Sequence, residues 1–151
     1  MHYCIYTPVN LTTFTNLDQL GPTTIGQRLI AAKAEILCEV SSPDPWCRTC
    51  GEPGVPRDTA TRRLTHKPFG WRPTVLVIKH RCHRCSHCRR VRLEDLSQAV
   101  APRQKISRTG LRRALVVLVC QHLSVSGIAE GLDVGTPPTK PDWHKSRFAN
   151  Q

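Results

Sequence analysis

The pattern of apolar and polar positions predicts a half-buried strand early in the chain. Across residues 34–40, the apolar residues Ile36, Cys38 and Val40 alternate with polar neighbours, a period of two that is typical of a strand with one face in a core. Cys38 is therefore expected to be a small core residue. Serine and proline at residues 41–45 indicate a turn after this strand.

A second region of strand pattern has the form of a hairpin. An extended segment at residues 61–66 precedes turn-rich residues 67–73, and an apolar run at 74–78 follows. Two antiparallel strands are expected here, the second of them ending near Lys79 or His80.

The periodicity changes to that of a helix after Ser107. One stripe of this helix consists of Leu111, Ala114, Leu115, Leu118 and His122. The apolar surface extends around nearly the whole helix because of Val116, Val117 and Val119. A helix this apolar is expected to be buried on more than one side.

A shorter helix is expected at residues 125–132, capped by Ser124 and followed by a glycine turn at 133–135. Two helices and a turn of this kind resemble the positioning half of a helix–turn–helix. The recognition helix should come next, but Pro141 would remove a helical hydrogen bond there, at a cost of about 3 kcal/mol. The motif is therefore expected to be incomplete.

Two Cys-x-x-Cys pairs flank the expected hairpin. Cys47 and Cys50 precede it, and Cys82 and Cys85 follow it, so antiparallel strands would bring four thiolates to one end. Four such ligands form a closed tetrahedral site for one structural Zn²⁺ ion. The sequence thus predicts a zinc ribbon, a small domain that needs its metal to stay folded.

The choice of ligands in the second pair is ambiguous on spacing, because Cys82, Cys85 and Cys88 form two overlapping Cys-x-x-Cys pairs. Cys82 and Cys85 are favoured because they follow most directly on the expected strand. Cys88 or His87 in place of Cys85 is the main alternative. A thioredoxin-type redox pair is a further alternative, but the Pro-Gly turn after Cys50 does not resemble the helix start that such a motif needs.

Positive charge is concentrated on the expected ribbon. Lys and Arg outnumber Asp and Glu by 22 to 11, and residues 59–93 contain no acidic residue. A dense cationic field favours polyanions, so nucleic acid is the expected partner, and a merely solvated face is the alternative. The residues expected to contact DNA are Arg62, Arg63, Lys67, Arg72, Lys79, Arg81, Arg84, Arg89 and Arg90. Phe69 and Trp71 are expected to pack the hairpin turn, with stacking on bases as the alternative.

The chain contains eight cysteines, and its first residues lack the charged start and apolar run of a signal peptide. Reduced thiols in the cytoplasm are therefore expected. The longest apolar stretch, residues 114–120, is too short to cross a bilayer, so no membrane partner is expected.

Two sets of residues agree in order and spacing with a known family. The first set is Trp46, Cys47, Cys50, Gly51, Pro56–Thr59, Arg62–His66, Pro68–Thr74, Arg81, Cys82 and Cys85, and the second is Ala101–Arg103, Ser107, Arg108, Gly110–Arg112, Gln121–Leu123 and Ile128–Leu132. Through these residues the chain resembles the N-terminal region of bacterial insertion-sequence transposases of the ISL-three family. The resemblance covers about residues 17–134, in order and spacing.

This resemblance implies that Cys47, Cys50, Cys82 and Cys85 bind zinc and that the ribbon and helices recognise the terminal inverted repeats of a mobile element in double-stranded DNA. Members of the family continue into an RNase-H-like catalytic domain with a metal-binding acidic triad. The sequence here resembles only the part before that domain, so a truncated, non-enzymatic, nucleoid-associated fragment is expected. The alternatives are an interaction module that binds itself or an intact transposase, and a non-functional pseudogene product.

The expected architecture is a small α+β protein with five parts. These are an N-terminal extension with one strand (1–45), the zinc ribbon (46–92), a linker (93–107), a partial helix–turn–helix (108–134) and a divergent tail (135–151).

Overall fold

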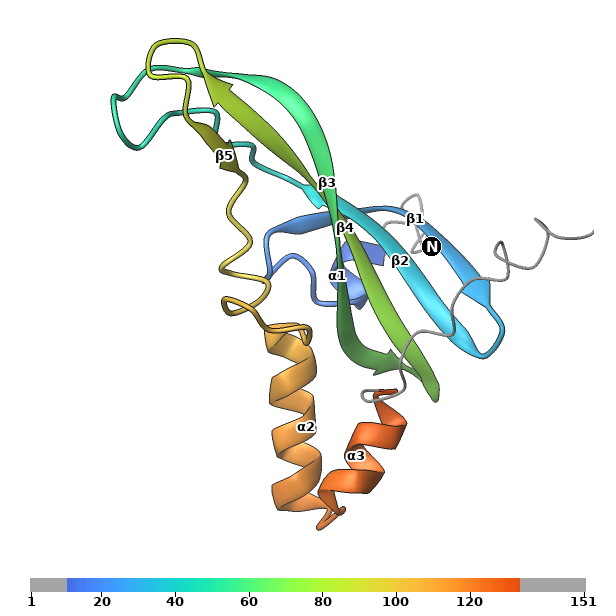
Figure 1. The fold of residues 1–151 in the computed structure, drawn as a ribbon. Helices are drawn as coiled ribbons and strands as arrows, with labels where there is room; N and C mark the ends of the chain where they lie inside the picture. The colour runs from blue at the N-terminus through green and yellow to red at the C-terminus, as the bar shows by residue number, and fades with distance from the viewer. Residues whose placement is uncertain (1–10, 134–151) are drawn as a thin grey trace, which may run out of the picture.

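The computed structural model describes residues 11–133 and shows a small α+β protein (Figure 1). Cys4 and the expected tail from residue 135 onward lie outside the described residues. The elements are α1 (Leu11–Phe14), β1 (Pro22–Ile30), β2 (Lys33–Val40), β3 (Gly54–Phe69), β4 (Arg72–Cys85), β5 (Val91–Leu93), α2 (Arg108–Cys120) and α3 (Val125–Gly131).

The five strands form one sheet with β4 at its centre. Along one edge β4 pairs with β3, and along the other it pairs first with β2 and then with β5. The β2–β4 pair is parallel, whereas the other pairs are antiparallel. The strand expected at residues 34–40 is thus confirmed, and its pairing makes the expected N-terminal extension part of the same sheet as the hairpin.

The antiparallel hairpin is confirmed, but its strands are much longer than the sequence pattern indicated. Pairing runs from Gly54 opposite Cys85 down to Phe69 opposite Arg72, and Gly70 makes the turn with a φ of 65°. Strand β4 does not end near His80, because its last residues pair with β3 on one side and with β5 on the other. The pattern around residues 80–85 is polar and basic, so it lacks the alternation that identifies a strand in sequence.

One face of the sheet carries the core. Its buried residues come from the strands, from the loop after α1 and from the segment between β5 and α2: Leu17, Leu20, Ile36, Cys38, Leu64, Leu76, Ile78, Leu96, Ala99 and Val100. Cys38 is fully buried, as expected of a core residue. The expected linker at residues 93–107 therefore contributes to the core. Its side chains Leu96, Ala99 and Val100 are buried there, which removes their apolar surface from water.

His66 joins three segments that are far apart in sequence. Its Nδ1 lies 2.7 Å from Ser107 Oγ, and its Nε2 lies 2.9 Å from the carbonyl oxygen of Thr15. Ser107 also caps α2 by accepting a hydrogen bond from the Gly110 N–H. The imidazole is 1% exposed, and burial lowers its pKa to about 4.

Both expected helices are present, with Ser124 capping α3 through the Gly127 N–H. The expected burial of α2 is wrong. Leu115 is 53% exposed and Val119 is 67% exposed, and Gly110 at the first turn is the buried residue of this helix. The helix contacts β3 through its N-terminal end and then extends beyond the sheet, together with α3, on the side opposite β5 (Figure 1). Its apolar residues therefore face solvent within the described chain.

Candidate metal centre and basic surface

The first cysteine pair lies in a tight turn before β3. The Gly51 N–H donates to the Cys47 carbonyl oxygen at 2.8 Å, and the Cys47 N–H donates to the Glu52 carbonyl oxygen at 2.9 Å. Gly51 has a φ of 75°, which glycine adopts without strain. The turn directs both thiols toward the end of the hairpin.

The second turn repeats this geometry at the end of β4. The Cys85 N–H donates to the Arg90 carbonyl oxygen at 2.9 Å, five residues ahead, as in the first turn. Arg89 directly follows Cys88 and has a φ of 58°. Two turns of the same form thus face one another across the end of the hairpin.

Four thiols meet between these turns. Cys47, Cys50, Cys85 and Cys88 have all their sulfur atoms within 4.8 Å of one another. The Sγ atoms of Cys47 and Cys88 are 3.5 Å apart, and the Sγ of Cys50 is 3.3 Å from that of Cys85 and 3.7 Å from that of Cys88. A tetrahedral Zn²⁺ ion with bonds of about 2.3 Å separates its sulfur ligands by about 3.8 Å. The cluster could therefore hold one metal ion after a small expansion.

Cys82 is not part of this group, so the ligand set chosen from the sequence needs correction: Cys88 takes the place of Cys82. Cys82 lies inside β4, where it pairs with Asp58 on β3 and Leu93 on β5. Cys82 is three residues before the end of β4, whereas Cys85 is the last residue of the strand and begins the turn that carries Cys88 to the cluster. The overlapping spacing of the three cysteines left this choice open, and the length of β4 decides it.

The thiols of the cluster are coupled electrostatically. Backbone N–H groups of Thr49 and Cys50 lower the pKa of Cys47 to about 6. The backbone N–H of Glu52 favours the Cys50 thiolate, but the hydrogen bond shared with Cys85 and the other thiols around it raise the pKa of Cys50 to about 12. One thiolate therefore opposes ionisation of the next. A bound dication removes this opposition, because it stabilises all of the thiolates together.

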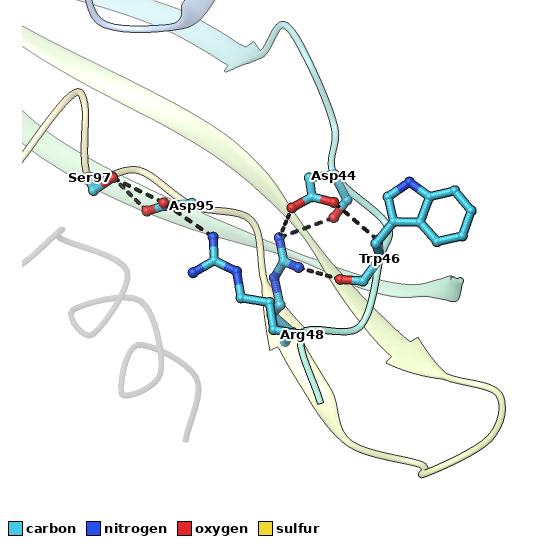
Figure 2. Close-up of polar contacts among 6 residues, drawn as sticks. Asp44, Trp46, Arg48, Asp95 and Ser97 are labelled. Atoms are coloured by element: carbon cyan, nitrogen blue, oxygen red, sulfur yellow. Dashed lines mark hydrogen bonds and ion pairs between the residues drawn. The ribbon is translucent and has the colours of Figure 1, made fainter. Parts of the chain in front are cut away.

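An arginine on β5 holds the first cysteine turn in place. The Arg92 guanidinium donates to the Trp46 carbonyl oxygen and, at 2.7 Å, to Oδ2 of Asp44. This ion pair lowers the pKa of Asp44. Beside it, Arg48 lies 3.7 Å from Asp95, whose carboxylate also accepts hydrogen bonds from Ser97 (Figure 2). The strand that follows the second turn thus fixes the loop that carries the first.

The nine basic residues expected to contact DNA divide into two groups in the structure. Several are engaged with protein groups: Arg62 with the Gln104 carbonyl oxygen, Arg63 with Glu35, Lys67 with Asn16, Arg72 with the Trp71 ring and Arg90 with Thr49. Burial of Glu35 opposes its ionisation, but hydrogen bonds from Arg63 and Arg28 outweigh this and lower its pKa. The guanidinium groups beside this carboxylate therefore have a structural role.

The second group is exposed and has no carboxylate partner within residues 11–133. It consists of Lys79, Arg81, Arg84 and Arg89, together with Arg57, which the sequence reasoning did not select. All five lie in the half of the hairpin that ends at the cysteine cluster, and Arg57 sits at a bulge in β3. We call these five residues the free basic group.

The aromatic residues of the hairpin tip do not pack the turn as expected. Trp71 is 76% exposed and Phe69 is 46% exposed. The guanidinium of Arg72 lies 4.9 Å from the centre of the Trp71 ring, a cation–π contact. The tip therefore presents its rings to solvent.

No family model, curated protein or solved structure matches the chain. None of the helices in the described range is long and apolar enough to span a bilayer.

Proposed function

We propose that this protein is a zinc-stabilised DNA-binding module. The observation that carries the proposal is the free basic group, which lies without carboxylate partners on the half of the hairpin that ends at the four-thiol cluster. When unpaired surface cations neutralise phosphates, the counterions condensed on the nucleic acid are released, and this release favours binding. Zinc is the metal of choice, because a closed tetrahedral four-thiolate site is typical of structural zinc.

In this proposal the metal has a structural role. It ties the turn before β3 to the turn after β4, so the free basic group is held on a rigid hairpin end. The four cysteines leave no ligand position open for water.

The resemblance to ISL-three transposases extends the proposal to a specific target, the terminal inverted repeats of an insertion sequence. The capped helices α2 and α3 support this extension, since two helices joined by a short turn are the positioning half of a helix–turn–helix. The expected site of the recognition helix lies outside the described residues.

The test of DNA binding is a salt titration measured by fluorescence anisotropy with a labelled duplex. Binding that weakens with salt is expected, and the triple variant K79A/R81A/R84A should reduce the slope of log K against log salt by about 2.7, that is 0.9 for each lost phosphate contact. The matched control K33A/R103A/K105A removes the same charge elsewhere and should leave the slope nearly unchanged. If the zinc-loaded protein does not bind the duplex at low salt, the proposed DNA binding is wrong.

Target recognition requires a separate comparison. A duplex carrying a terminal repeat of an ISL-three element should compete more strongly than a scrambled duplex of equal composition. Equal competition would leave general DNA binding in place and contradict the specific target.

A second candidate function is self-association through α2. The observation that favours it is the exposure of apolar side chains along one helix, among them Leu115 and Val119. Exposed apolar patches of this kind mark interaction surfaces. Light scattering over a concentration series tests the idea, with L115E/V119E as the variant that should shift a dimer toward monomer. A wild-type monomer at every concentration would count against it.

A further inference from the structure

Within residues 11–133, one edge of β3 has no strand beside it. The strand pairs with β4 along one side, and the sheet of the described chain ends there. On its other side a single parallel bridge joins Thr65 to Ile106, in the segment before α2. The edge at residues 58–63, next to this bridge, is therefore available to another strand, and we call it the open edge.

The hydrogen bonds of Thr65 show which backbone groups the open edge presents. Its N–H donates to the Lys105 carbonyl oxygen and its C=O accepts from the Ser107 N–H, each at 2.8 Å, so both groups of Thr65 point away from β4. Residues 58–66 pair with β4 without a register shift, and backbone groups alternate in direction along a strand. The outward N–H and C=O groups of the open edge therefore belong to Thr59, Thr61 and Arg63.

One of these outward donors is already used. Asp58 Oδ1 accepts a hydrogen bond from the Thr59 N–H at 2.7 Å, whereas the N–H groups of Thr61 and Arg63 have no partner among residues 11–133. A row of unpaired N–H and C=O groups is the template with which a sheet edge pairs with another chain. The open edge thus offers the pairing groups for an added strand of about five residues.

The charge around the open edge indicates the chemistry of the added strand. Thr61 pairs with Lys79 on β4, and Thr59 pairs with Arg81; these four residues are exposed and lie on the face of the sheet away from the core. Strand β4 has no acidic residue, and neither cation has a carboxylate partner in the described chain. An added strand would lie about 10 Å from β4, a span that a lysine or arginine and a glutamate bridge together across a short threonine. Acidic side chains on this face of the added strand would therefore meet Lys79 and Arg81.

We infer that the open edge binds an extended acidic peptide, which adds a strand beside β3 and places its carboxylates next to Lys79 and Arg81. A second copy of this chain fits the edge less well, because its own β3 carries Arg62 and Arg63 and would bring like charges together. Nucleic acid fits it less well too, because a sugar–phosphate backbone lacks the regularly spaced N–H donors that pair with strand carbonyl groups. The inference does not depend on the proposed DNA binding.

The first experiment measures the fluorescence anisotropy of a labelled peptide in which glutamate and valine alternate, so that its carboxylates share one face. A peptide of the same composition, with all glutamates before all valines, should bind about fivefold more weakly. In the variant T61P the outward N–H is lost without loss of a bond to β4, a position at which an edge strand tolerates proline, so affinity for the alternating peptide should fall roughly tenfold. The matched control T61V keeps this N–H and should bind as the wild type does.

A second pair of variants predicts a gain of affinity, which a misfolded protein cannot imitate. D58A frees the Thr59 N–H for the peptide, while D58N removes the same charge but keeps an oxygen that accepts from this N–H. D58A should therefore bind the alternating peptide about fivefold more tightly than D58N.

Several results would overturn the inference. Equal affinity of T61P and T61V, or of D58A and D58N, would mean that the cations attract any polyanion and that the edge forms no ladder. Absence of peptide binding at millimolar concentration would have the same consequence. Light scattering that shows wild-type dimers, dissociated by T61P, would identify a second copy of the chain as the occupant instead.

Discussion

Gly51 and Arg89 occupy equivalent positions in the two cysteine turns, each directly after the second cysteine of its pair and each with a left-handed φ, 75° for Gly51 and 58° for Arg89. The turns are therefore alike in backbone shape but differ in strain. This left-handed conformation costs a residue with a side chain roughly 1–2 kcal/mol of conformational free energy, whereas glycine adopts it without that cost.

This difference predicts that R89G stabilises the zinc-loaded protein by about 0.5–1 kcal/mol, because relief of strain exceeds the added flexibility of glycine. Urea unfolding measures the change. The neighbouring variant R90G, at a residue with an ordinary φ, should destabilise instead. A loss of stability in R89G would show that the Arg89 side chain makes a contact worth more than the strain.

The cysteine geometry predicts different effects for two serine variants. C88S should lose most of the bound zinc because it removes one of four clustered ligands, while C82S should retain about one ion per chain because the Cys82 thiol is not in the cluster. Metal content by mass spectrometry, and the absorption of the cobalt-substituted proteins, measure this. Zinc retained by C88S and lost by C82S would contradict the structure.

Arg92 is predicted to support the metal centre without touching the ion. R92A removes the hydrogen bonds to Trp46 and Asp44 that hold the first turn, so zinc affinity should fall roughly tenfold while all four thiols remain. Competition with a chromophoric chelator gives the affinity. R90A removes a single long contact of 3.4 Å to Thr49 and should change affinity far less.

The burial of His66 predicts that the folded protein loses stability as the pH falls below 6.5. Its pKa is about 4 in the folded protein and about 6.5 when unfolded, so its contribution is complete above pH 6.5 and is lost as the pH falls toward 4. The loss between pH 7 and pH 5 should be about 2 kcal/mol.

Comparison with H66Q isolates this contribution, since protonation of the cysteines affects both proteins alike. H66Q should be less stable at pH 7 but should lose about 2 kcal/mol less than the wild type on going to pH 5. Parallel curves for the two proteins would mean that the pKa of His66 is the same in the folded and the unfolded protein.

Local patterns in the sequence were sufficient for several elements. The alternation of Ile36, Cys38 and Val40 identified β2, while the helical periodicity after Ser107 and the cap at Ser124 marked the two helix starts. Each of these signals depends on residues a few positions apart, so it can be recognised in the sequence without knowledge of the tertiary structure. The first strand, β1, was missed because it lacks a clear apolar alternation and gains its partner only through β2.

The sequence by itself determined that two cysteine pairs flank a basic hairpin, because thiol spacing and charge are properties of the chain. Tertiary structure alone decided which four thiols meet, that the free basic group lies exposed beside them, and that His80 and Glu94 line one cavity. The physical reason is the pairing of β4 with β3, β2 and β5 at once. That pairing extends β4 through Cys82 to Cys85, moves the second turn to Cys88, and brings residues from distant segments to one end of the sheet.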